Sequence, residues 1–211
     1  MQVTKYGHCC LLIEINGVHF LTDPGTFSVI PETCPPVDYV VITHEHADHI
    51  HVPSLKRLIK QMPQVQVITN TAVGALLSAE HIPYIIHEAG HTARYGGVSL
   101  TGYGELHAAV HASVAQVQNT GYLFNESLFY PGDAFTHPHV SIDVLALPTA
   151  GPWMKLSEAL AYATELHPKS VIPVHDGIYA RPDMMNPLIE RVLTTSGIRF
   201  VQLPIGETVT L

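Results

Sequence analysis

Positively charged side chains are scarce in this chain, and charged side chains of either sign are few. Lys and Arg together number 10 of 211 residues, Asp and Glu number 18, and the formal net charge is −8. Charged residues make up 13% of the chain, against about 25% in typical soluble domains. So few cations argue against a nuclease that holds a long phosphate backbone by charge. The low charge also predicts many strands that are buried on both faces.

Cysteine and long apolar runs are also scarce. Cys9, Cys10 and Cys34 are too few for a disulfide framework, and an adjacent pair forms a poor disulfide. No run of about 18 apolar residues could span a bilayer, and Glu14 interrupts the apolar run near the N-terminus, so we expect neither a membrane anchor nor a secretion signal. These features predict a reduced, cytoplasmic protein. Cys9 and Cys10 adjoin His8 and could form another metal site, but small side chains on a buried strand are the expectation.

Histidine is abundant, with 15 in the chain, and its densest group is T-H-E-H-A-D-H at residues 43–49. Because alternate residues of a strand share a face, His44 and His46 can reach one ion. If the backbone then turns, Asp48 and His49 point to a second position about 3.5–4 Å away, as in two-metal hydrolytic sites. Neutral imidazole and carboxylate are ligands for Zn, Mn or Fe(II). A polar surface turn is the alternative, but the density of the pattern favours a metal.

This motif resembles the signature of the metallo-β-lactamase superfamily of metal-dependent hydrolases, and the resemblance extends over the whole chain. Later segments match in order, namely G-E-L-H-A at 104–108, Y-P-G-D-A at 130–134 and I-P-V-H-D at 172–176. The opening segments Y-G-H-C-C-L-L-I-E at 6–14 and L-T-D-P-G at 21–25 look like the branch that includes ascorbate-6-phosphate lactonase-like proteins.

The resemblance implies a centre of two divalent ions, with Zn expected first and Mn or Fe as alternatives. The first ion would take His44, His46 and His107, the second would take Asp48, His49 and His175, and Asp133 would bridge them because a carboxylate has two oxygens. The resemblance places the histidine of Glu-x-His-Ala as the ligand, so His107 is preferred to His111. His111 is then left for an outer contact with the centre or for a contact with substrate.

Two further residues are candidates for supporting roles. Asp23 suits a carboxylate that fixes the orientation of a ligand histidine, although an Asp-Pro-Gly turn explains it equally well. Trp153 is the only tryptophan and lies in a loop between an expected strand and helix. With Lys155 nearby it could hold an anionic substrate, although core packing is the commoner fate of a lone tryptophan.

The order of the expected elements predicts one domain over residues 1–211. Strands are expected at 2–6, 9–15, 18–22, 39–42, 65–69, 84–86, 98–103, 121–124, 128–130, 144–147, 170–173 and near 200, and helices near 53–59, 72–79, 156–166 and 184–193. The loop at 25–38, broken by three prolines, could form one wall of the site. Strands followed by helices, twice over, favour the α/β class (α+β), as a four-layer αββα sandwich with two roughly duplicated halves.

These expectations combine into a cytoplasmic, binuclear metal-dependent hydrolase that uses a metal-bridging hydroxide on a small ester, lactone or phosphoester. Asp48 would orient the hydroxide and pass its proton to the leaving group. Departures from relatives weigh against two activities: Ile50 and His51 stand where glyoxalase II-like hydrolases usually carry Gly-Gly, and His46 stands where flavodiiron-type members often carry Glu.

Two alternatives to this hydrolase stay open. One is a phosphodiesterase or nuclease of the same fold, which a basic groove would support. The other is a non-catalytic metal-binding or sensing protein, against which the presence of Asp48 argues. The expected partner is a small-molecule substrate, with no nucleic acid and no membrane, and homo-oligomer formation is left open.

Overall fold

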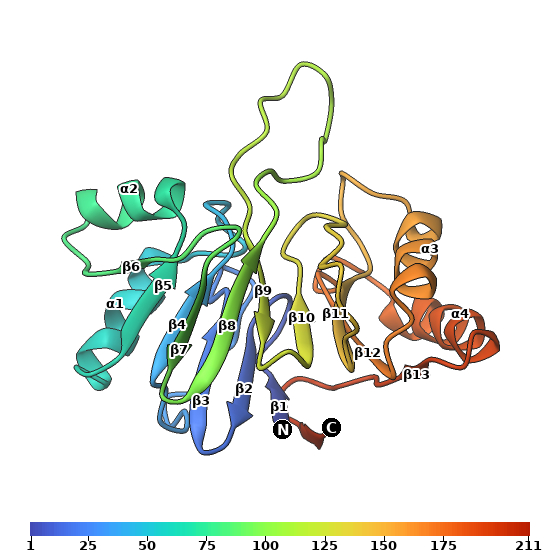
Figure 1. Ribbon diagram of the computed structural model, residues 1–211, viewed down its shortest axis with the longest axis horizontal. Helices are drawn as coiled ribbons and strands as arrows, with labels where there is room; N and C mark the ends of the chain where they lie inside the picture. The colour runs from blue at the N-terminus through green and yellow to red at the C-terminus, as the bar shows by residue number, and fades with distance from the viewer.

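The computed structural model describes residues 1–211, and its strands form two seven-stranded mixed sheets (Figure 1). The first sheet has the order β14-β1-β2-β3-β4-β5-β6 and the second the order β13-β12-β11-β10-β9-β8-β7. The strands of the first sheet are β1 (Gln2–Lys5), β2 (Leu11–Ile15), β3 (Val18–Thr22), β4 (Tyr39–Ile42), β5 (Gln66–Thr69), β6 (Ile85–Ile86) and β14 (Thr208–Thr210). Those of the second are β7 (Thr92–Tyr95), β8 (Val98–Tyr103), β9 (Gly121–Phe124), β10 (Leu128–Tyr130), β11 (Val144–Pro148), β12 (Ser170–Val174) and β13 (Arg199–Phe200).

Four helices cover the outer faces of the two sheets. Helices α1 (Val52–Gln61) and α2 (Thr71–Ala79) flank the first sheet, and α3 (Leu156–Leu166) and α4 (Pro182–Thr195) flank the second (Figure 1). The apolar spacing of α1 buries Leu55 and Leu58 against the first sheet. The Asn70 side chain caps α2 by accepting a hydrogen bond from the Val73 amide, 3.1 Å away. The four-layer αββα arrangement predicted from the sequence is confirmed. No helix combines the length and hydropathy that crossing a bilayer requires.

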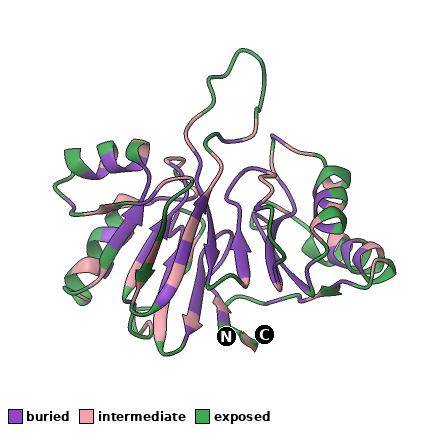
Figure 2. Ribbon diagram, viewed as in Figure 1, coloured by how far each residue is buried: buried purple, intermediate pink, exposed green.

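Strand β4 illustrates why the chain has so few charged residues, because both of its faces are buried. Val40 and Ile42 pack toward the helices, whereas Val41 packs toward the second sheet. Because side chains alternate between the faces of a strand, a strand between two apolar layers needs apolar residues at every position. Figure 2 shows the same burial for most strands, with the exposed residues on the outer helices and loops.

Most strand bounds agree with the sequence expectations to within one residue, and the structure differs more at three strands. β2 begins at Leu11 instead of Cys9, because residues 7–10 form a turn in which the Cys10 amide donates to the Gly7 carbonyl over 2.8 Å. The sequence analysis missed β7 and β14, which are short, largely exposed edge strands that pair with β8 and β1. Their alternation of polar and apolar residues is too brief to be recognised without the neighbouring strand.

The parallel strands bring distant segments to one edge of the sandwich. β3, β4 and β5 run parallel in the first sheet, and β10, β11 and β12 run parallel in the second. Their carboxyl ends therefore lie on the same side, where the loops after β4, β10, β11 and β12 meet. The loop at 104–120, which follows β8, projects beyond this edge (Figure 1). Ligands bind preferentially in crevices outside the carboxyl ends of parallel strands.

Candidate metal centre

The histidine motif reverses direction directly after β4. The amides of His49 and Ile50 both donate to the His46 carbonyl, over 2.9 and 3.0 Å. This turn separates His44 and His46 from Asp48 and His49, as the two-position hypothesis requires. The backbone of the motif packs against Gly25, where an added Cβ would overlap the carbonyl group of Asp48 and the amide of His49.

The first ligand group consists of His44, His46 and His107. One ring nitrogen from each lies within 4.8 Å of the others, and the Nε2 of His44 is 3.1 Å from the Nδ1 of His46. His107 arrives from the 104–120 loop and brings its ring centroid to within 5.0 Å of that of His44. Burial lowers the pKa of His44 well below its usual value, helped by the nearby His49, and burial also lowers the pKa of His46. Both rings are therefore held neutral, which is the state that binds a metal.

The second ligand group consists of Asp48, His49 and His175. The Oδ2 of Asp48 lies 3.5 Å from the Nε2 of His175 and 4.0 Å from the Nε2 of His49. His175 comes from the loop after β12, and the ring centroids of His44 and His49 are only 3.9 Å apart. The two groups are therefore adjacent within one cluster.

Asp133 lies between the two groups and contacts both. Its Oδ2 is 2.9 Å from the Nε2 of His175 and 3.3 Å from the Nε2 of His107, and its Oδ1 is 3.2 Å from the Nε2 of His49. Burial would raise the pKa of Asp133, but the charge of His49 and hydrogen bonds from the surrounding imidazoles hold it well below its ordinary value. The structure thus brings together the seven residues that the sequence analysis selected as ligands.

Three of the histidines present the same nitrogen to the centre. The Nδ1 of His49 donates to Asp23, that of His44 donates to the hydroxyl of Thr43, and that of His107 donates to the Ala108 carbonyl. Each bond fixes the ring orientation and leaves Nε2 facing inward, the arrangement that is usual for metal-ligating histidines.

Several inward-facing atoms have no hydrogen-bond partner, including the Nε2 of His49 and the Oδ1 of Asp133, which are both buried. A buried polar atom left unpaired costs about 1–3 kcal/mol. Electrostatics point the same way, because neighbouring carboxylates overcome the effect of burial and raise the pKa of His175 to about 10. The part of the cluster beside Asp48 and Asp133 therefore favours positive charge, and the nitrogen and oxygen donors of the cluster fit divalent cations.

Asp23 is fully buried beneath the motif and accepts several hydrogen bonds. Its Oδ1 accepts from the Thr43 amide over 2.8 Å, and its Oδ2 accepts from the Thr43 hydroxyl, the Nδ1 of His49 and the Tyr130 hydroxyl over 2.6 to 2.7 Å. The sequence analysis left open whether Asp23 orients a ligand histidine or belongs to an Asp-Pro-Gly turn. In the structure Asp23 accepts a hydrogen bond from His49, and its carbonyl also accepts one from the Gly25 amide.

Trp153 contacts the shared carboxylate. Its Nε1 donates to the Oδ2 of Asp133 over 2.9 Å, and its side chain is 8% exposed. The sequence analysis considered contact with substrate or core packing for this residue and did not anticipate a hydrogen bond that holds Asp133. Trp153 and Lys155 also line a cavity of about 240 Å³ beside the 104–120 loop.

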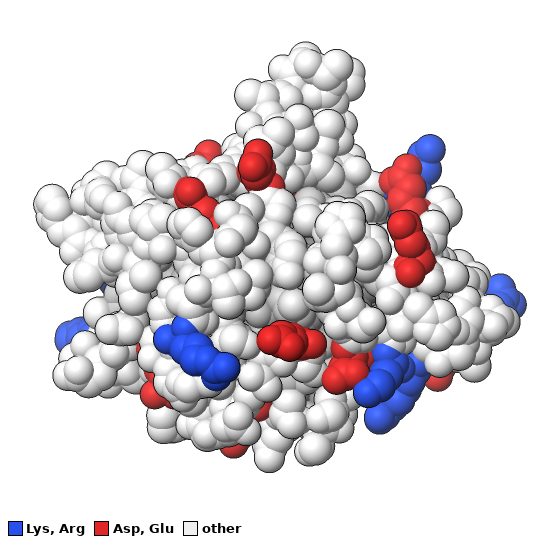
Figure 3. All heavy atoms as spheres, in the orientation of Figure 1, with Lys and Arg blue, Asp and Glu red and all other residues white.

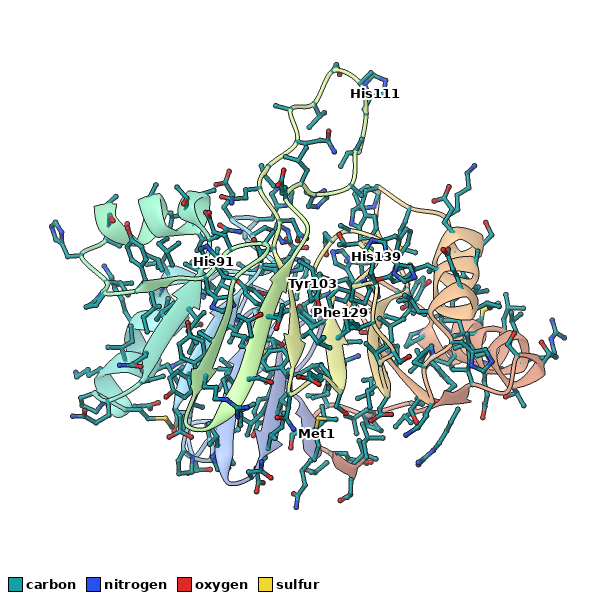
Figure 4. The ribbon with its side chains drawn as sticks, viewed as in Figure 1. Met1, His91, Tyr103, His111, Phe129 and His139 are labelled. Carbon is teal, nitrogen blue, oxygen red and sulfur yellow. The ribbon has the colours of Figure 1, made fainter.

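His111 does not join the cluster. It lies at the tip of the 104–120 loop (Figure 4), is exposed, and hydrogen-bonds through Nδ1 to the Ser113 hydroxyl at 2.8 Å. An outer contact with the centre is therefore not made in this structure, and contact of His111 with substrate stays a prediction.

His8 and Cys9 are close to the centre, whereas the sequence analysis raised them only as part of a separate metal site and expected Cys9 on a buried strand. The Nε2 of His8 lies 3.3 Å from the Oδ2 of Asp48, and its ring centroid is 4.2 Å from that of His175. Donor atoms of His8, Cys9, His49 and His175 all lie within 4.8 Å of one another. The sequence signal is the Tyr-Gly-His-Cys segment at residues 6–9, in which a histidine adjoins a cysteine and the glycine permits the turn.

Three residues at the centre have left-handed backbones that residues other than glycine seldom adopt. The φ angles are +34° at His8, +34° at Asp23 and +57° at His175. Such strained conformations persist where the surrounding structure enforces them, and they cluster at functional sites. The amide of His175 donates to the His8 carbonyl over 3.2 Å, which couples two of these turns.

Comparison with known proteins adds family relationships to this geometry. Residues 2–175 match the beta-lactamase superfamily domain. Protein Rv0786c of Mycobacterium tuberculosis is 34% identical over 215 residues, covering 100% of each chain. A protein named UPF0173 metal-dependent hydrolase, from Methanocaldococcus jannaschii, is 23% identical over 221 residues, again covering 100% of each chain.

Solved structures show the same fold. Igni18, described as a novel metallo hydrolase from Ignicoccus hospitalis, superposes with a TM-score of 0.78 at 21% identity, covering 99% of this chain and 97% of the other. The metallo-beta-lactamase fold protein YhfI from Bacillus subtilis superposes with a TM-score of 0.74 at 16% identity, covering 99% and 98%. At these identities the comparison bears on the fold alone.

Proposed function

Because the chain belongs to the metallo-β-lactamase superfamily and is a metal-dependent hydrolase, we propose that it works with two divalent ions on a small ester, lactone or phosphoester. The observation that carries the proposal is Asp133, whose two oxygens face imidazoles of both ligand groups. His44, His46 and His107 would hold one ion, Asp48, His49 and His175 the other, and Asp133 would contribute to both. Nitrogen and oxygen donors suit Zn first, with Mn or Fe as alternatives.

When bound, divalent ions polarise the group under attack and lower the pKa of a coordinated water from about 15.7 to near 7. The side chain that suits proton transfer is Asp48, because it is 25% exposed whereas Asp133 is 3% exposed. Hydrogen bonds to His175 and His8 lower the pKa of Asp48 despite its partial burial, so the carboxylate is ionised at neutral pH. An ionised carboxylate at the cluster surface could take a proton from water that bound ions have made more acidic and return it to a leaving group.

The surroundings favour a small substrate that is not a long polyanion. A cavity of about 250 Å³ adjoins His8, and its only ammonium group, on Lys5, is paired with both oxygens of Asp176 at 2.6 and 2.7 Å. Figure 3 shows scattered Lys and Arg side chains on the visible face, without a continuous basic strip. We therefore favour a small ester, lactone or phosphoester over a nucleic acid.

Two finer assignments belong to the same proposal. The segments at 6–14 and 21–25 support placing the chain near the ascorbate-6-phosphate lactonase-like branch. Three free cysteines, two of them buried, support a reducing cytoplasmic location.

The test is a substrate screen with the metal-loaded protein. Lactones, carboxylic esters, thioesters, phosphomonoesters and phosphodiesters are assayed after loading with Zn, Mn or Fe. We expect turnover on a small ester, lactone or phosphoester. In Asp48→Asn the turnover rate should fall by about 10²- to 10⁴-fold, because the amide cannot take a proton. Asp143→Asn, on the surface beside Lys169, is the matched control and should retain activity.

Two results would contradict the proposed function. Full activity in Asp48→Asn would remove its proposed role as proton carrier. Tight, steeply salt-dependent binding of oligonucleotides, together with cleavage of those chains alone, would favour a nuclease.

A further inference from the structure

The sulfur of Cys9 lies inside the cluster of buried imidazoles. Cys9 is 1% exposed and precedes β2 in the turn formed by residues 7–10. Its sulfur and one ring nitrogen each of His8, His49 and His175 lie within 4.8 Å of one another. His49 and His175 belong to the second ligand group, so the thiol is next to the position proposed for the second ion.

The imidazoles around this sulfur have unsatisfied nitrogens. The Nδ1 of His8, the Nε2 of His49 and the Nδ1 of His175 are all buried without a hydrogen-bond partner. The side chains of His8 and His49 are fully buried and that of His175 is 3% exposed. Three buried imidazoles that each carry an unpaired nitrogen thus surround the sulfur, and such a group points to a ligand that several of them share, because each nitrogen left unpaired is costly.

Two hydroxyl groups hold the backbone of Cys9 in place. Its carbonyl accepts hydrogen bonds from the Thr22 hydroxyl over 2.8 Å and from the Tyr130 hydroxyl over 3.1 Å. The Tyr130 hydroxyl also lies 2.6 Å from the Oδ2 of Asp23, which accepts the hydrogen bond from His49. One phenol therefore contacts both the backbone of Cys9 and the carboxylate that orients His49, which ties these two segments together.

The neighbouring cysteine has a different environment. Cys9 packs in the cluster between the two sheets, whereas Cys10 packs among apolar residues between the first sheet and its helices. Cys34 lies in the loop after β3 at the margin of that second cluster. One of the three cysteines therefore reaches the metal centre, and the other two provide controls.

We infer that Cys9 supplies a thiolate ligand to the second ion, beside His49 and His175. This inference rests on the proposed two-metal function. On binding, the thiol loses its proton to solvent and a sulfur–metal bond forms, with no change in oxidation state. Thiolate is a soft ligand, so sulfur at this position favours zinc or cobalt over manganese or magnesium.

Cobalt substitution tests the inference without measuring activity. Metal-free protein is titrated with Co²⁺ while the near-ultraviolet spectrum is recorded, because a thiolate bound to cobalt gives a charge-transfer band that imidazole and carboxylate do not give. We expect this band with up to two equivalents of cobalt, its loss in Cys9→Ser and Cys9→Ala, and its retention in Cys10→Ser and Cys34→Ser. Far-ultraviolet circular dichroism and the visible bands of the remaining cobalt establish that each variant is folded.

The possible failures are distinguishable. Two bound cobalt ions without the band, or a band that survives in Cys9→Ala, would overturn the thiolate ligand and leave the proposed function standing. A protein that binds fewer than two ions would overturn both. Chelator competition gives a second readout, in which Cys9→Ala should weaken the second zinc by at least about tenfold and change manganese binding much less.

Discussion

The Nδ1 of His49 donates a hydrogen bond to the Oδ2 of Asp23 over 2.7 Å, and both side chains are fully buried. Because the same carboxylate also accepts from Thr43 and Tyr130, it cannot rotate without breaking several bonds. The ring of His49 is thereby fixed with its Nε2 facing Asp133. The geometry of the second ligand group therefore depends on a residue that touches no proposed metal position.

Replacing this carboxylate should weaken the second ion specifically. Asp23→Asn removes the charge and offers an amide where three donors converge, so we expect the second zinc to bind about 10- to 100-fold more weakly. Calorimetric titration of metal-free protein measures both affinities. Asp38→Asn, whose carboxylate accepts from the His19 amide at the surface, is the control. An unchanged second affinity in Asp23→Asn would mean that His49 needs no orienting partner.

Trp153 should act on the centre through Asp133. Trp153→Phe keeps an aromatic ring but removes the donor 2.9 Å from the Oδ2 of Asp133, so we expect metal affinity to fall by about 10-fold or more. Tyr179→Phe removes a hydroxyl that bonds to the Thr149 carbonyl outside the ligand set, and its metal affinity should match that of the wild type. Equal affinity in Trp153→Phe and the wild type would reduce Trp153 to a packing residue.

Gly25 should be required by the close approach of two chain segments. An alanine Cβ at this position would overlap the Asp48 carbonyl group, so Gly25→Ala should displace the ligand loop and lower both the metal content and the melting temperature. Gly17→Ala is the control, since its Cβ would meet nothing within 4 Å although its φ is +80°. Left-handed strain there should cost about 1–2 kcal/mol of stability without loss of metal. Full metal content in Gly25→Ala would show that the loop can shift.

The helices, the strands and part of the ligand set could be predicted from local sequence. The other ligands and Cys9 depend on contacts between distant segments, which local sequence does not show. The strands and helices follow from apolar periodicity, and the spacing of His44, His46, Asp48 and His49 indicates two positions without further information. His107, Asp133 and His175 are far apart in the chain, so their association depended on the resemblance to a family. Cys9 was assigned to a plain buried strand because the turn at residues 7–10, which directs its sulfur to the centre, depends on the left-handed backbone of His8.

The metal-free protein should lose stability as the pH rises. The pKa of His175 is raised from 6.5 to about 10 in the folded state, against the effect of burial, by Asp133 and Asp48. A raised folded-state pKa stabilises the protein fully below the unfolded value, and this stabilisation disappears as the pH passes through the folded value. Urea unfolding of chelator-treated protein should therefore show falling midpoints from about pH 6.5 to about 10, and His175→Gln should flatten the trend. Midpoints that are flat or that rise over this range would contradict the assigned charge state.

The number of metal ions per chain tests the central claim most directly. Elemental analysis of protein purified without chelator and supplied with zinc, manganese or iron should give close to two ions per chain, since seven ligands exceed what one tetrahedral ion can use. His175→Ala should retain the ion held by His44, His46 and His107, and so give close to one. A wild-type value that stays near one under all three metals would contradict the two-metal centre.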